Sequence, residues 1–152
     1  MTKIEVGELL YTVSMKITDV TEYGVSIMDV MNPEATLPPA GARFDIAVAG
    51  DAQGPKLDGT IQAVDYLHVR ADRRAQLHIH GAITTSGGAK IAIFADGIAT
   101  PEANDPSVNH LRENVSLHTN HPEFEWVNPL QIWGIGVVEM AKFEINITGY
   151  IA

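Results

Sequence analysis

Apolar and polar residues alternate one by one along most of this chain, and helical periodicity is almost absent. Alternation of this kind is typical of strands that bury one face and leave the other polar. It predicts strands over residues 9–18, 23–30, 43–50, 60–71, 75–85, 89–97, 115–119, 126–138 and 142–151. The best candidate for a short helix is the segment 108–113.

The predicted strands follow one another at the spacing of consecutive hairpins, with turn residues between them. No strand–helix–strand alternation occurs, which excludes parallel doubly wound folds. The remaining choices are an antiparallel barrel and a sandwich. A barrel of about eight strands has no sheet edges and can enclose one small ligand. We therefore predict an all-β fold, an antiparallel barrel of about eight strands with at most one short helix, formed by residues 1–152 as a single domain.

Composition limits the chemistry. The chain has no cysteine, which excludes disulfide scaffolds, zinc fingers, iron–sulfur clusters and thiol nucleophiles, and leaves His, Asp and Glu as metal ligands. A net charge of −9 repels nucleic acid and anionic lipid, so neither is expected as a partner. The start, MTKIEVGELLYTV, lacks the long apolar core of a signal peptide, and a cytoplasmic location is expected.

The hairpin YLHVRADRRAQLHIHG, residues 66–81, contains three histidines. One register pairs His68 with His78 and Tyr66 with His80, and sets Arg70 opposite Gln76. In that register all six side chains share one face, because successive residues of a strand alternate. The opposite face is aliphatic and consists of Leu67, Val69, Leu77, Ile79 and Ile83.

Two interpretations of the polar face stay open. It is solvated on the outside of the sheet, or it lines a barrel cavity that holds a substrate. In the second case His80 and His78 are the candidate base and acid, since clustered imidazoles separate in pKa. His68 and Tyr66 would assist them. The candidate substrate-binding residues are Arg70, Asp65, which would fix a histidine tautomer, His118, Trp126 and Asn128.

A zinc site is an alternative use of the same residues. An H-x-H pair plus a histidine on the neighbouring strand can hold catalytic zinc with water in the fourth position, and His68, His78 and His80 provide this set. The pattern is short, however, and no longer metal signature is present. We therefore predict no cofactor, with zinc as the alternative.

Four segments resemble the domain of unknown function 3237 family, also known as uncharacterised protein family 0311. They are GARFDIAVAGDAQGPKLDGTI, DYLHVRAD, GGAKIAIFADG and FEWVNPLQIWGIGVV, in the family's order and spacing. The matching positions are Gly41, Arg43, Gly54, Pro55, Leu57, Gly59, Asp65, Tyr66, Trp126 and Asn128. The resemblance implies a small antiparallel barrel with an inner cavity, calycin-like or allene-oxide-cyclase-like. His68, His78 and His80 depart from the family's usual residues.

Function is predicted from these features together. The leading hypothesis is an enzyme without organic cofactor that uses histidine acid–base chemistry in the barrel cavity. Its substrate would be a small, largely apolar carbonyl or hydroxyl compound, and its class an isomerase, lyase, cyclase or hydratase. The alternatives are a non-catalytic binding barrel, a zinc-dependent hydrolase using His68, His78 and His80, and a structural protein. An apolar outer face would favour a homo-oligomer.

Overall fold

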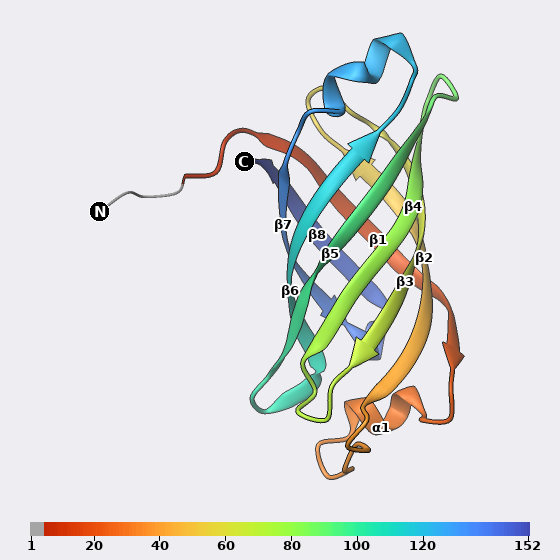
Figure 1. Cartoon of the computed structure of the whole chain (residues 1–152), viewed down its shortest axis with the longest axis vertical. Helices are drawn as coiled ribbons and strands as arrows, with labels where there is room; N and C mark the ends of the chain where they lie inside the picture. The colour runs from red at the N-terminus through yellow and green to blue at the C-terminus, as the bar shows by residue number, and fades with distance from the viewer. Residues whose placement is uncertain (1–4) are drawn as a thin grey trace.

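The computed structural model describes residues 5–152, and these form a closed antiparallel barrel in which eight strands follow one another in chain order (Figure 1). The last strand pairs with the first, so the sheet has no free edge. The predicted fold class is confirmed. The strands are β1 (Leu9–Glu22), β2 (Ala42–Gln53), β3 (Gly59–Val69), β4 (Ala75–Thr85), β5 (Lys90–Glu102), β6 (Asp105–His118), β7 (Ile132–Glu139) and β8 (Glu144–Ile151).

Three short helical segments interrupt the strands: α1 (Ile27–Met31), η1 (Pro122–Val127) and η2 (Met140–Lys142). The strand predicted over 23–30 is therefore wrong, because Ser26 caps α1 by accepting a hydrogen bond from the backbone N–H of Met28. The helix predicted over 108–113 is also wrong. That segment lies inside β6 and pairs with both β5 and β7. Within residues 5–152, no helix is long and apolar enough to cross a lipid bilayer.

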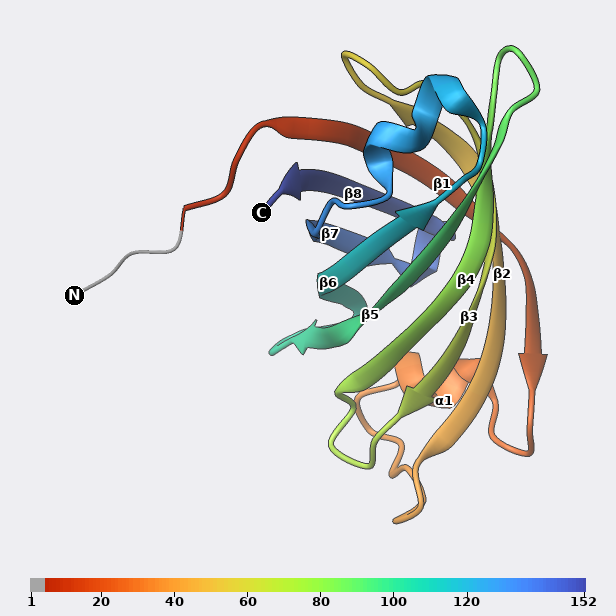
Figure 2. The same ribbon diagram turned by 45° about the horizontal axis from the view of Figure 1, so that its top comes forward.

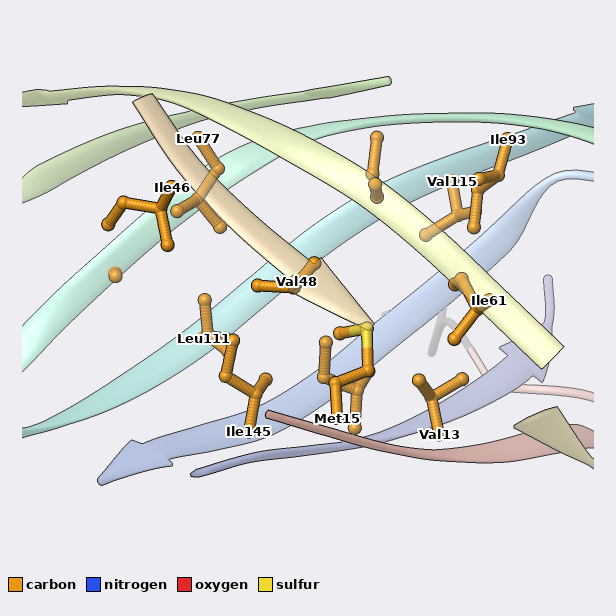
Figure 3. Close-up of a cluster of buried hydrophobic side chains, with 14 of the residues drawn as sticks. Val13, Met15, Ile46, Val48, Ile61, Leu77, Ile93, Leu111, Val115 and Ile145 are labelled. Atoms are coloured by element: carbon orange, nitrogen blue, oxygen red, sulfur yellow. The ribbon is translucent and has the colours of Figure 1, made fainter. Parts of the chain in front are cut away.

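The hydrophobic core lies inside the barrel. Every strand sends alternate residues inward, and these are almost all aliphatic; Figure 3 shows Val13, Met15, Val48 and Ile145 among them. An eight-stranded barrel has an interior just wide enough for side chains or one small ligand. Burying one face of each strand supplies most of the favourable free energy of folding.

One end of the barrel is covered by α1, which lies across it in both views (Figures 1 and 2). Ile27 and Val30 of this segment line the barrel interior. Arg73, in the β3–β4 turn, attaches the segment to the barrel. Its Nε donates to the carbonyl oxygen of Val30, and its Nη2 donates to three more carbonyl oxygens, those of Asp29, Asn32 and Ala35.

Arg73 also has a left-handed backbone, with φ at 70°, which is unfavourable for a residue with a side chain. The hydrogen bonds of its guanidinium offset that cost and keep the end of the barrel closed. Removal of this charged donor leaves α1 with the packing of its partly buried residues and the hydrogen bond that the backbone N–H of Ile27 donates to Glu22.

We expect Arg73→Ala to lower the free energy of unfolding by about 2 kcal/mol, because the substitution removes charge-assisted hydrogen bonds. Amide hydrogen exchange over residues 27–35 should become faster, while the strands keep their protection. Arg74→Ala is the matched control, since the Arg74 side chain contacts only Asp72 among the ion pairs. Equal effects of the two substitutions would contradict the role given to Arg73.

Candidate functional site

The β3–β4 hairpin has the two faces that the sequence predicts, in a register shifted by two residues. His68 pairs with Gln76 and Val64 with His80, and the same register places His78 opposite Tyr66. The predicted pairs of His68 with His78 and of Tyr66 with His80 are wrong. A shift by two residues preserves the alternation, so the polar side chains still share one face.

That polar face lies on the outside of the barrel. His78 and His80 are exposed, His68 is half-buried, and Tyr66 is 38% exposed. Of the two interpretations left open, the structure therefore shows the solvated outer face, and the leading hypothesis is wrong in placing the histidines in the barrel cavity. The reason is the opposite face: Leu67, Leu77 and Ile83 are buried, and only one face of a strand can enter the barrel. A catalytic role for these outer side chains stays a prediction.

The outer side chains form an ordered cluster. His78 and His80 are adjacent, with 3.2 Å between their Nε2 atoms. Phe94 packs against both rings, at centroid distances of 5.5 and 5.1 Å. Tyr66 lies on the other side, and the Arg43 guanidinium is 5.5 Å from the centre of its ring.

The predicted substrate-binding residues are dispersed. Arg70 is exposed and pairs with Asp72, and His118 faces outward from the end of β6. Trp126 lies in η1 and packs against the core from one end of the barrel. The amide of Asn128 is occupied, since it accepts from the N–H of Thr119 and donates to that residue's carbonyl.

Asp65 differs from the other four predicted substrate-binding residues because it lines the barrel interior. Its Oδ1 accepts a hydrogen bond of 3.0 Å from the backbone N–H of His78. The predicted contact with a histidine ring is thus replaced by a contact with the histidine backbone. The imidazoles lie on the other side of the barrel wall.

The interior contains a cavity of about 100 Å³. At roughly 10–15 Å³ for each water-sized site, this volume holds a molecule of about seven to ten non-hydrogen atoms. Its walls are mainly aliphatic. The polar residues that line it are Tyr11, Asp65, Arg73, Asn109 and Glu113. A largely apolar pocket with a few converging polar groups is the usual form of a small-molecule site.

Glu113 is the most unusual of these residues, because it is 6% exposed and faces the core. Its strand partners on either side are both glycines, Gly97 in β5 and Gly134 in β7. A Cβ at Gly134 would lie 3.1 Å from Oε2 of Glu113, so the glycine leaves space for the carboxylate. Within residues 5–152, Oε1 of Glu113 is buried without a hydrogen-bond partner. Such an atom is costly unless a ligand or water satisfies it.

Tyr11 lies three strands away from Glu113 around the barrel and lines the same cavity. Gly134 pairs with Gly149, and Gly149 pairs with Tyr11. The Tyr11 ring occupies the space above Gly149, where a Cβ would come within 2.2 Å of Cε1. Burial, and then the charge of Glu113, raises the pKa of the Tyr11 phenol well above its usual range. Tyr11 is therefore a neutral O–H donor.

The two carboxyl groups have pKa values close to neutrality. Burial, and then the charge of Asp65, raises the pKa of Glu113 to about 7. Burial raises the pKa of Asp65 to about 6, against the lowering effect of the His78 backbone N–H and the charges of His78 and Arg43. The cavity thus holds one carboxylate and one group poised to carry a proton near pH 7.

Sequence reasoning identified Asp65 and missed Glu113 and Tyr11. The signal for Glu113 was present: Leu111, Glu113 and Val115 alternate with polar residues, so a carboxylate stands on an apolar face. The prediction of a helix over 108–113 concealed it. Tyr11 looks like an ordinary core aromatic in sequence.

A three-histidine zinc site is not formed in the part of the chain that the structure describes. No group of three or more His, Asp or Glu side chains there is arranged to hold a metal ion. His78 and His80 contact each other, whereas His68 lies further along the hairpin, two residues from Tyr66 on β3.

A family model described as protein of unknown function (DUF3237) matches residues 11–150. The chain belongs to this family. The resemblance seen in the sequence is confirmed. Among curated proteins, nothing matches the DUF3237 chain.

Solved structures share the barrel at low sequence identity. A β-barrel-like protein from Acinetobacter baumannii AYE has a TM-score of 0.77 and 19% identity, with 99% of this chain and 97% of that chain covered. A conserved protein of unknown function from Rhodopseudomonas palustris has a TM-score of 0.76 and 20% identity, with both chains covered completely. A structure described as an enzyme from Penicillium herquei has a TM-score of 0.67 and 19% identity, with 100% and 99% covered. These likenesses show the fold.

The raised carboxyl pKa values predict that the fold loses stability as the pH rises. A folded-state pKa above the unfolded value means that the folded protein keeps a proton which the unfolded chain has released. The stabilisation of the folded protein by these retained protons is full below about pH 4, decreases up to about pH 7, and is absent above that pH. As the pH rises from about 5 to about 8, the free energy of unfolding of Glu113→Gln should increase by about 3 kcal/mol relative to that of the natural chain.

Denaturant unfolding at the two pH values measures this difference. Glu125→Gln, which changes an exposed carboxyl in η1, is the matched control and should follow the natural chain at both. If the stability of Glu113→Gln has the same pH dependence as that of the natural chain, Glu113 does not titrate as described.

Proposed function

We propose that this protein is an enzyme without organic cofactor that moves protons on a small, largely apolar carbonyl or hydroxyl compound inside the barrel. The observation that carries the proposal is Glu113, a residue that lines the cavity and whose buried Oε1 has no hydrogen-bond partner within residues 5–152. A buried acceptor without a partner is costly for stability, and carboxyl groups with raised pKa values in one cavity are typical of functional sites. The Penicillium herquei protein with the same barrel is described as an enzyme.

The roles follow from the environment of each group. Asp65, with the lower pKa and a backbone N–H on Oδ1, is the carboxylate that removes a proton. Glu113, with the higher pKa, carries the proton that is delivered. The Tyr11 hydroxyl, which stays protonated, is a donor for an oxygen that gains negative charge.

The reaction class is proton abstraction next to a carbonyl group, or from a hydroxyl group. The C–H or O–H electron pair moves toward the carbonyl, and the carbonyl oxygen receives the proton of Glu113. When Asp65 returns its proton to another carbon and the enol O–H proton goes back to Glu113, the product is an isomer. Attack of a deprotonated hydroxyl oxygen of the substrate on its carbonyl carbon gives cyclisation. The aliphatic walls exclude water, and this strengthens the electrostatic interactions of both carboxyl groups with the substrate.

The substrate class follows from charge. The cavity holds two acidic groups, and Arg73, the one cationic side chain that lines it among residues 5–152, is engaged with four backbone carbonyls. An anionic compound would be repelled by the two acidic groups, and Arg73 would not be free to pair with it. The proposal is therefore for uncharged compounds of about seven to ten non-hydrogen atoms.

Hydrogen–deuterium exchange tests the proposal without knowledge of the natural substrate. A panel of neutral ketones and hydroxyketones is incubated with the protein in deuterated buffer, and exchange next to the carbonyl is followed by NMR. We expect catalysed exchange for some members, and losses of about 10²-fold or more in Asp65→Asn and Glu113→Gln. Glu125→Gln is the matched carboxyl control.

The variants His78→Ala and His80→Ala separate the interior site from histidine chemistry on the outer wall. Exchange that survives in both, but not in the carboxyl variants, supports the interior pair. Exchange lost with the histidines would overturn it. Saturable binding of the same compounds without exchange would indicate a ligand-binding barrel.

A further inference from the structure

We propose that His78 and His80 form a surface site for one divalent transition-metal ion, on the outer wall of the barrel. This site is separate from the interior carboxyl pair and does not depend on the proposed function. The two residues occupy positions i and i+2 of β4, so their side chains leave the strand on the same face. Both are exposed, so an ion can reach them from solvent.

The distance between the ligand atoms fits a chelate. The two Nε2 atoms are 3.2 Å apart. With metal–nitrogen bonds of about 2.0–2.1 Å, this separation corresponds to a nitrogen–metal–nitrogen angle of roughly 100–106°. That angle is close to tetrahedral. The separation of the two nitrogens therefore suits an ion that bridges them.

The rings are held in place before an ion arrives. Phe94, opposite His80 in the β4–β5 ladder, packs on both imidazoles, and Tyr66 packs on them from β3. The imidazole planes meet at 68° with centroids 4.9 Å apart. Ordering by two aromatic side chains reduces the entropy that the histidines lose on binding.

The ligand type decides which ions fit. Imidazole nitrogen suits Zn²⁺, Ni²⁺ and Cu²⁺, while Mg²⁺ and Ca²⁺ require oxygen ligands. Cu²⁺ binds most tightly of these ions to a given nitrogen site. The protein supplies two ligands, so water completes the coordination. Asp96 pairs with His78 across β4 and β5 and brings a carboxylate to the same outer face.

The arrangement also connects the outer site with the interior. The backbone N–H of His78 donates to Asp65 in the cavity, while its imidazole is outside. One residue therefore contacts both sides of the barrel wall.

Copper titration of the full chain, freed of metal by chelator and dialysis, tests the site. Calorimetry should give one Cu²⁺ per chain, and electron paramagnetic resonance should show hyperfine splitting from two imidazole nitrogens. His78→Ala and His80→Ala should each weaken binding more than the roughly tenfold that loss of an outer-shell partner costs. Mg²⁺ should not compete.

His118→Ala is the matched control, because His118 is equally exposed at the end of β6 but has no neighbouring histidine on its strand. Circular dichroism checks that each variant folds, and the exposed positions make that the expected result. Copper binding that is unchanged in the variant lacking both His78 and His80, or equally weakened by His118→Ala, would overturn the proposal. A signal from fewer than two nitrogens would overturn it as well.

Discussion

Closure of the sheet on itself governs the rest of this structure. A barrel of eight strands has one interior, and each strand can place only one of its two faces there. The aliphatic faces enter because their removal from water supplies the largest favourable free energy. All polar side chains that remain must then stand outside, or be tolerated inside at a cost. Both kinds of polar cluster in this protein follow from that division.

The interior cluster depends on residues that have no side chain. Gly134 leaves space beside the Glu113 carboxylate, and Gly149 leaves space for the Tyr11 ring, so the barrel interior holds a carboxylate and a phenol where other positions carry aliphatic groups. Close packing of protein interiors makes such space uncommon. The same packing keeps water out and raises the pKa values of the acidic groups. The glycines and the close packing around them therefore account for the space in the cavity, the burial of the acidic groups and their raised pKa values.

The wall between the two clusters is a single layer of backbone. At the centre of the β3–β4 hairpin the backbone N–H of His78 turns to the Asp65 carboxylate instead of a neighbouring carbonyl. Neighbouring residues of β3, Asp65 and Tyr66, consequently serve opposite sides of the wall. This local exchange of partners positions the interior carboxylate and leaves the outer aromatic and imidazole rings packed together.

The sequence alone determined the strand class, most strand positions and the grouping of Tyr66, His68, His78 and His80 on one face, because the two-residue period is a local property of the chain. It also flagged Asp65. It could not decide which face points inward, since alternation looks the same when the two faces are exchanged. Glu113 escaped notice because a polar stretch favoured a helix, and only pairing with β5 and β7 extends β6 through it. Which residues surround the cavity is set by strands distant in sequence, and only closure of the barrel brings them together.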